Sequence, residues 1–395
     1  VIMPTPCWVS YVEMVKIAQG KSVLVRTTME NNFCLTAEQL EAAITPNTKL
    51  LMLCSPNNPT GSVYTLENLK ALVEVLKRHP QVVVLADEIY QHILYTGKHE
   101  TLAQFPELED RLIVINGVSK AYAMTGYRIG WMASHDKELL TAVKRLQGQT
   151  ISCATTIAQK AAEAAYSGDQ TCVEEMRQAF HRRRNLIVGL AKEIPGMKVL
   201  EPQGAFYLFP DVSAFFGKQY NGQTIHNADE LVTYLLQEAH VACVSGSAFG
   251  EDNCIRFSYA TSEDLIIEAM RRMKEALAKL QWLTPTYQLN ALVRLDRFQY
   301  NLDDFYKNYL PIHIKMDDED DKRDFIVSLI EVSKNPELVS YVSLIIHLLD
   351  QYRYGLLSKK TVLKASNSIL ENQLNKDEWL SMKLLLDYII KNQLD

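Results

Sequence analysis

A lysine and an arginine lie close together in an otherwise uncharged stretch of the sequence, NGVSKAYAMTGYRIGW (116–131). Lys120 stands among small residues, and Arg128 follows eight positions later, two residues after Gly126. Burying two like charges in one neighbourhood is costly unless an anionic or covalently bound group lies between them. The pair therefore indicates a site for an anionic ligand, with an amine that is available for covalent chemistry.

Other polar side chains follow apolar stretches that are typical of buried strands. Asp87 ends VVVLAD and Tyr90 comes three residues later, while Asn58 lies in SPNNPTG directly after another apolar run. Each has an ordinary interpretation as a turn or helix-capping residue. In an open parallel sheet, however, ligands bind beyond the carboxyl ends of the strands. A carboxylate, a phenol, an amide and the Lys120 amine are therefore expected to meet at one edge.

The elements that must position these groups alternate between strand and helix. Four runs are continuously apolar, as expected for strands of a sheet that is covered on both faces. They are residues 22–27, 49–55, 82–87 and 112–117. Helices are expected to begin after Thr36 and Thr65, each a plausible N-cap. This alternation predicts the α/β class, with a mainly parallel, doubly wound sheet and helices on both faces.

The rest of the chain predicts two further regions. A long helix over 174–194 is followed by mixed strands and helices up to about 280, which indicates a smaller α+β domain. Beyond an acidic run at 317–321, apolar periodicity predicts a separate helical bundle of unknown role. The expected domains are 1–186 (large, cofactor-binding, truncated at its N-terminus), 187–280 (small) and 281–395 (helical).

Composition excludes several classes of protein. The net charge of −6 argues against a nucleic-acid binder with a broad basic face, and no apolar segment is long enough to span a membrane. The seven cysteines are scattered and the histidines lack metal-binding spacing, so neither a disulfide framework nor a metal site is expected. Three consecutive arginines, 182–184, are expected to form a solvated helix face.

Together these segments resemble class I/II aminotransferases, the pyridoxal-phosphate enzymes of fold type I, and most of all the bacterial aspartate aminotransferase subgroup. The resemblance covers residues 1 to about 280 and leaves the tail unrecognised. It rests on PCWVSYVEMV, SPNNPTG, ADEIYQHILY, NGVSKAYAMTGYRIGW, GAFYLF and IRFSYATS, which occur in the order typical of the family. It implies a fold type I architecture with the smaller domain appended.

The resemblance also implies catalytic roles for three residues. Lys120 corresponds to the lysine that forms a Schiff base with pyridoxal 5′-phosphate and then moves a proton at the substrate α-carbon. Asp87 is expected to pair with the pyridine nitrogen, with a pKa held low by that cationic partner. Tyr90 is expected to hydrogen-bond the ring O3′ and tune the Schiff base.

Binding roles follow from the same resemblance. Arg128 is expected to grip the cofactor phosphate through its planar guanidinium. Asn58 is expected to bond O3′ and Trp8 to stack on the ring, and both are also expected to contact the substrate. Arg256, in CIRFSYA, corresponds to the arginine that binds the substrate α-carboxylate.

Two departures from the family pattern bear on phosphate binding. The family's N-terminal segment, which carries a phosphate-binding loop and residues that reach the partner subunit, is not in this sequence. Gly117 stands where some relatives have a serine on the phosphate. The chain is therefore expected to be a fragment of a longer protein or a degraded relative.

The expected function is transamination between an amino acid and a 2-oxo acid. Aspartate and 2-oxoglutarate are the leading pair of substrates. A homodimer in the cytoplasm is the expected working unit. Two catalytic alternatives stay open, a pyridoxal-phosphate β-lyase and an aromatic or prephenate aminotransferase, because the same residues serve all of these reactions. A third alternative is a non-catalytic fragment whose helical tail has an interaction role.

Overall fold

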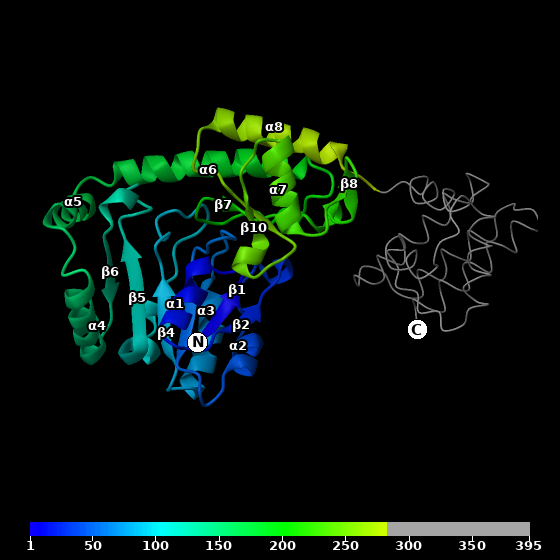
Figure 1. Ribbon diagram of the computed structural model, residues 1–395. Helices are drawn as coiled ribbons and strands as arrows, with labels where there is room; N and C mark the ends of the chain where they lie inside the picture. The colour runs from blue at the N-terminus through cyan, green and yellow to red at the C-terminus, as the bar shows by residue number, and fades with distance from the viewer. Residues whose placement is uncertain (283–395) are drawn as a thin grey trace, which may run out of the picture. The chain divides into compact units, whose positions relative to one another are not determined.

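A six-stranded sheet forms the centre of the structure, a computed structural model that describes residues 1–282 of the 395. The strand order is β2-β1-β3-β4-β5-β6. The pairs from β2 to β5 are parallel, and β6 runs antiparallel to β5 (Figure 1). The strands are β1 (Ile2–Thr5), β2 (Val23–Arg26), β3 (Leu50–Cys54), β4 (Val83–Asp87), β5 (Leu112–Gly117) and β6 (Gly130–Ala133).

Helices cover both faces of this sheet, as predicted. One face packs against α2 (Ala37–Ala43) and α3 (Leu66–Arg78), through inward residues such as Leu51, Leu40 and Leu72. Alternate strand residues face the other way, where Met3 and Met52 join a core that includes α1 (Val9–Ile17). This alternation follows from the two-residue period of a strand.

The expected N-caps are confirmed. The Thr36 side chain accepts a hydrogen bond from the Gln39 backbone at 3.2 Å, and Thr65 accepts one from the Asn68 backbone at 3.2 Å. In both turns the third helical residue bonds back to the cap, which satisfies two of the otherwise unpaired amides at the helix start. The helices that link the strands therefore begin where the sequence indicates.

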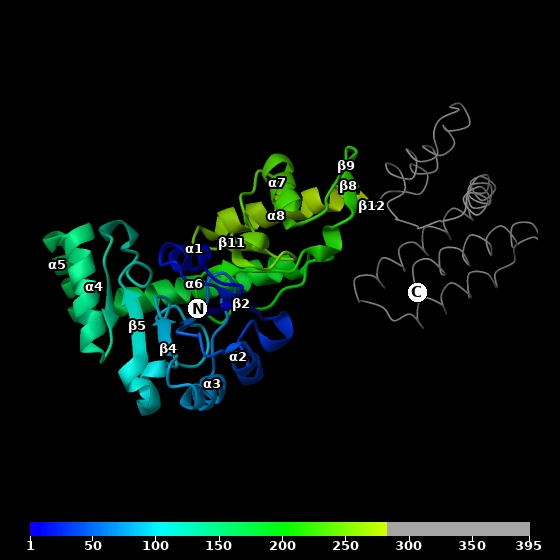
Figure 2. The ribbon, with the colours of Figure 1, turned by 60° about the horizontal axis from the view of Figure 1, so that its bottom comes forward.

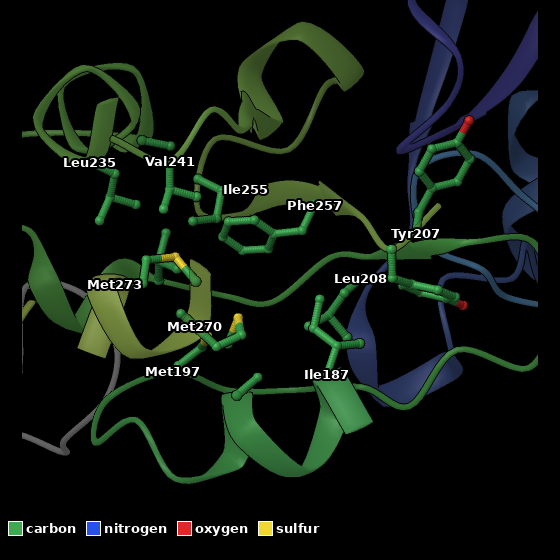
Figure 3. Packing of buried hydrophobic residues seen from close by; sticks show 14 of the residues in the cluster. Ile187, Met197, Tyr207, Leu208, Leu235, Val241, Ile255, Phe257, Met270 and Met273 are labelled. Carbon is green, nitrogen blue, oxygen red and sulfur yellow. The ribbon is translucent and has the colours of Figure 1, made fainter. Parts of the chain in front are cut away.

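The second half of the described chain is built on a long helix, α6 (Thr171–Lys192), which packs against α8 (Glu263–Lys279) (Figure 1). With α7 (Ala228–Glu238), these helices pack on an antiparallel sheet of β10 (Val244–Ser245), β11 (Ile255–Ser258) and β7 (Tyr207–Leu208). Figure 3 shows the core between them, where Met270, Phe257 and Leu208 meet. The expected α+β character of this half is thus present.

The remaining elements are short or lie at the far side of the central sheet. Figure 2 shows α4 (Lys137–Thr150) and α5 (Thr156–Ser167) beside β5 and away from α7 and α8. The other short strands are β8 (Lys218–Tyr220), β9 (Gln223–Thr224) and β12 (Gln281–Trp282). Short 3-10 helices lie at Met29–Asn31, Leu102–Gln104, Pro106–Arg111, Thr125–Tyr127, Ser213–Phe215 and Gly246–Phe249.

Some strands differ from the expectation. The strands β1 and β6 were not predicted, because each has only four residues and contains a proline or glycine that indicates a turn. The strand β2 alternates between half-buried and exposed residues, although a fully covered strand was expected there. Its position at the edge of the sheet explains this, since an edge strand is packed less completely.

The prediction that residues 182–184 form a solvated arginine face is wrong for one of the three, Arg184. The side chain of Arg184 is buried, pairs with Glu201, and donates to the Pro202 carbonyl at 3.1 Å. Its guanidinium also lies over the ring of Tyr95, 5.2 Å from the centroid. Consecutive residues fan around a helix, so one of three neighbouring arginines points to the core side.

Residues Val1–Leu280 form one compact unit. The division expected at 186/187 falls inside α6, so the two halves of this unit share a continuous helix. That division stays a prediction. The helical bundle expected over 281–395 lies, beyond residue 282, outside the described residues.

Candidate active site

The candidate residues gather at the carboxyl edge of the central sheet, as the strand-end argument predicted. Asp87 is the last residue of β4, and Lys120 comes three residues after β5 ends. Asn58 lies in the loop after β3, and Arg128 precedes β6 by two residues. Because β6 runs antiparallel to β5, the start of β6 lies at the same edge where the parallel strands end.

The loop after β3 is fixed by its own polar residues. The Asn57 side chain donates to the Pro6 carbonyl at 3.0 Å and to the Thr60 hydroxyl at 3.1 Å. Gly61 has a φ of +69°, and a Cβ there would lie 2.6 Å from the Cβ of Pro202. Glycine is needed at that turn for both reasons. Asn57 thus shapes the loop, and the neighbouring Asn58 is free to face the site.

Arg256 reaches the same edge from β11 in the second sheet. Its Nη1 donates to Oδ1 of Asn58 at 2.9 Å. The guanidinium lies over the rings of Tyr207 and Phe249, at 4.6 Å and 4.8 Å from their centroids. Its Nε is buried and, within the described residues, has no hydrogen-bond partner. Burial lowers the pKa of Arg256. This guanidinium is therefore held in place with donor capacity to spare for an anion.

Two tyrosines form a buried hydroxyl pair beside the loop. The Tyr90 and Tyr207 hydroxyls lie 2.9 Å apart, and the two rings meet edge to face. Burial, followed by the neighbouring Tyr207, raises the pKa of Tyr90 well above its ordinary value. Tyr90 therefore stays protonated at neutral pH and can donate to an oxygen of a ligand. The role of Tyr207 was not predicted, although its segment GAFYLF belongs to the family pattern.

Asp87 has a partner that sequence reasoning missed. The Tyr11 hydroxyl, on α1, donates to Oδ2 of Asp87 at 2.6 Å, and the Ile89 amide donates to Oδ1 at 3.1 Å. Burial nevertheless raises the pKa of Asp87, against these donors and the charge of Lys120. The low pKa expected for Asp87 beside a cationic ring nitrogen stays a prediction. The sequence signal that could have pointed to Tyr11 is its place in PCWVSYVEMV, the same family segment that contains Trp8.

Lys120 lies between aromatic rings and charged groups. Its Nζ is 5.7 Å from the ring centroids of both Tyr90 and Phe206. Burial, followed by the charges of Arg128 and Arg256, lowers the pKa of Lys120, although Asp87 opposes this shift. A lowered pKa increases the neutral fraction of the amine, and the neutral amine is the nucleophile. The sequence argument for a reactive lysine beside a second cation is consistent with this geometry.

Arg128 and Trp8 lie at the periphery of the site. Arg128 is exposed, with a left-handed φ of +53°, and its Nη1 donates to the Thr125 carbonyl at 2.8 Å. Trp8 directly precedes α1, is 37% exposed, and meets the ring of Tyr11 edge to face, with centroids 5.4 Å apart. Their expected contacts with a phosphate and a ring face stay predictions.

Three cations thus share the edge without carboxylate partners. Within residues 1–282, no carboxylate oxygen lies within 4.0 Å of the charged nitrogens of Lys120, Arg128 or Arg256. Asp87 is the nearby acid, and its two oxygens are engaged by Tyr11 and Ile89. Lys120 and Arg256 are partly buried, and partly buried cations without counterions are costly in the free protein, so the arrangement favours anionic ligands.

Comparison with known proteins identifies the architecture. Residues 1–273 match the family model described as aminotransferase class I and II. The chain belongs to this family. The enzymes of the family depend on pyridoxal 5′-phosphate, in agreement with the sequence resemblance.

Individual relatives agree with this placement. The chain is 48% identical to an aspartate aminotransferase of Geobacillus stearothermophilus over 286 residues, covering 70% of each protein. It is 43% identical to a bifunctional aspartate aminotransferase and glutamate/aspartate-prephenate aminotransferase of Petunia hybrida, covering 71% of this chain and 60% of that protein. The crystal structure of the Rhizobium meliloti aspartate aminotransferase aligns with a TM-score of 0.69 at 44% identity, over 71% of this chain and 70% of that one. The chain thus spans about 60 to 70% of these relatives.

The residues at the sheet edge fit pyridoxal phosphate by their chemistry. Lys120 offers an amine with a lowered pKa for the aldehyde, and Asp87 offers a carboxylate for the ring nitrogen. Tyr90 and Asn58 offer donors for the phenolic oxygen. Arg128 offers an exposed guanidinium without a carboxylate partner among the described residues for the phosphate. Arg256 retains an unpartnered buried nitrogen for a substrate carboxylate.

Among residues 1–282, no cluster of three or more His, Cys, Asp or Glu side chains is placed to hold a metal ion. None of the helices in this part of the chain is long and apolar enough to cross a membrane.

Replacing Tyr11 by phenylalanine is expected to raise the pKa of Asp87 further, because it removes the hydroxyl that stabilises the carboxylate. A hydrogen bond to a charged group is worth about 1.5–3 kcal/mol, so a shift of about one to two pH units is expected. Since the ionised carboxylate is the active form, the acidic limb of the kcat/KM profile should move to higher pH. An unchanged acidic limb would show that Tyr11 does not tune Asp87.

Proposed function

We propose that this chain catalyses pyridoxal-phosphate-dependent transamination, with aspartate as the preferred amino donor and 2-oxoglutarate as the preferred acceptor. The observation that carries the proposal is the Lys120 amine, with its pKa lowered, at the same edge as Asp87 and Arg256. The names of the relatives, which are aspartate aminotransferases, support aspartate as the amino donor.

Each residue has a defined task in this proposal. The cofactor, when bound, supplies the electron sink for the negative charge that develops at the substrate α-carbon. The carboxylate of Asp87 holds a proton at the pyridine nitrogen. Arg256 would bind the α-carboxylate and orient the Cα–H bond. Nζ of Lys120 would remove the proton at Cα and return it at C4′ of the cofactor, two bonds away across the nitrogen. The Tyr90 and Asn58 side chains hold the phenolic oxygen.

A donor panel tests the proposal directly. Purified chain is incubated with pyridoxal phosphate, 2-oxoglutarate and aspartate, an aromatic amino acid or a cysteine conjugate, and glutamate is measured. We expect glutamate formation to be fastest with aspartate. Prephenate as acceptor tests the prephenate alternative. Pyruvate and ammonia released without an acceptor would identify a lyase, and no turnover with any donor would count against the enzyme.

We further propose a cytoplasmic homodimer as the working unit. All seven cysteines are free thiols, which suits a reducing compartment. Beside β6, large apolar side chains are exposed on α4 and its surroundings, including Leu146, Ile151 and Ile157. Such a surface is typical of a protein contact. Light scattering of the purified chain should give twice the monomer mass, and a monomer would contradict the dimer.

A further inference from the structure

Three segments that carry site residues meet at one junction, and one of the three is the segment 202–207. The first is the loop after β3, which carries Asn58, and the second follows Tyr90. The third is the segment itself, which leads to Phe206 and Tyr207. Backbone hydrogen bonds of 2.9 Å join them, from Gln203 and Gly204 to Gly61, from Tyr95 to Gln203 and from Ala205 to Ile93. The positions of these loops are therefore coupled.

Ala205 is the strained point of this junction. Its φ of +55° lies in the left-handed region, which a residue with a Cβ seldom adopts without support from its surroundings. The Tyr95 hydroxyl donates to the Ala205 carbonyl. The Tyr259 hydroxyl lies 3.4 Å from the same oxygen and 3.2 Å from the Tyr95 hydroxyl. Tyr95 is therefore the main side-chain support of this conformation.

Helix α6 fixes Tyr95 in turn. The imidazole of His181 stacks on the Tyr95 ring, with centroids 5.3 Å apart and planes 17° apart. The guanidinium of the buried Arg184 lies 5.2 Å from the centroid of the same ring. The Tyr95 ring is thus confined, and its hydroxyl cannot follow the carbonyl of Ala205 if that segment relaxes.

The two residues after Ala205 touch the reacting groups. The ring centroid of Phe206 lies 5.7 Å from Nζ of Lys120 and 5.5 Å from the ring centroid of Tyr90. Tyr207 bonds the Tyr90 hydroxyl at 2.9 Å and lies under the guanidinium of Arg256. A change of φ at Ala205 would rotate both aromatic side chains away from these partners.

We propose that Tyr95 is a positioning residue for Lys120. By holding the left-handed Ala205, its hydroxyl keeps Phe206 against the Lys120 amine and Tyr207 against Tyr90 and Arg256. Tyr95 itself touches none of the reacting groups in the contacts described above. The inference rests on the proposed function only in taking Lys120 as the reacting amine.

The test replaces Tyr95 by phenylalanine and measures the pH dependence of the reactivity of the Lys120 amine, in protein without cofactor. Reductive methylation with ¹³C-formaldehyde, followed by peptide mapping, gives the pH midpoint at which the Lys120 amine becomes reactive. Its charged neighbours Asp87, Arg128 and Arg256 are unchanged in this variant. Loss of shielding by Phe206 should move the midpoint up by about 0.5 to 1 pH unit and lower kcat/KM about 10-fold.

Tyr234→Phe is the matched control. The Tyr234 hydroxyl is also buried and donates to a backbone carbonyl, that of Ala276 at 2.7 Å, far in the chain from the junction. The Tyr234→Phe variant should lower the melting temperature as Tyr95→Phe does. It should leave the pH midpoint of Lys120 and the value of kcat/KM unchanged. Equal midpoints for the two variants would overturn the proposal.

A second variant covers the case in which Tyr95→Phe does not fold. Tyr259→Phe removes the weaker contact to the same carbonyl and should move the Lys120 midpoint upward by a smaller amount. No movement in that variant, with Tyr95→Phe unfolded, would also overturn the proposal. A midpoint that moves in a chain without transaminase activity would sustain the role of Tyr95 and refute the proposed function.

Discussion

Replacing Lys120 by alanine is expected to abolish covalent retention of pyridoxal phosphate and to lower turnover by about 10⁴-fold or more. The variant removes the amine that attaches the cofactor and also the group that moves the proton at Cα. The burial of the position and the charges of Arg128 and Arg256, which lower the pKa of this amine, stay in place. The measurement is the visible absorption of the protein after incubation with cofactor and gel filtration, together with single-turnover rates.

Lys120→Arg separates charge from chemistry in this experiment. Arginine keeps the positive charge, but its guanidinium is not deprotonated at neutral pH and cannot serve as the nucleophile. We expect Lys120→Arg to be as inactive as Lys120→Ala. Retained colour and turnover in the alanine variant would show that another group performs the chemistry, and the assignment of the site would be wrong.

Much of this site was predictable from the sequence because of how parallel sheets are built. Asp87 and Lys120 follow apolar runs that could be recognised as buried strands, and the carboxyl ends of parallel strands share one edge. Periodicity and turn residues therefore suffice to bring them together. The N-caps Thr36 and Thr65 were predictable for the same reason, since their signals are local.

Residues from other elements were harder to place. Arg256 lies on a separate sheet, so only the family resemblance predicted its role, and no local pattern shows that it meets Asn58. Tyr11 contacts Asp87 across 76 positions of sequence. The burial of Arg184 was missed because a run of three like charges resembles a solvated surface, and its pairing with Glu201 is a tertiary event.

Replacing Arg256 by leucine is expected to lower kcat/KM for aspartate by about 10²–10³-fold. The guanidinium is held over Tyr207 and Phe249 and bonded to Asn58, so it meets a carboxylate with little loss of freedom. Truncating one partner of a buried, hydrogen-bonded charge pair costs about 2–5 kcal/mol, and each 1.4 kcal/mol is a factor of ten. Steady-state rates over a range of aspartate concentrations measure the effect.

Two comparisons tie that loss to the α-carboxylate. Arg256→Lys keeps the charge and loses the fork of donors, so its loss should be smaller, about 10-fold. An amine donor without an α-carboxylate should react equally slowly with the native chain and with Arg256→Leu, because the missing interaction is the same in both. If the leucine variant instead slowed both donors by the same factor, Arg256 would act through the aromatic rings that it covers, and the carboxylate would be bound elsewhere.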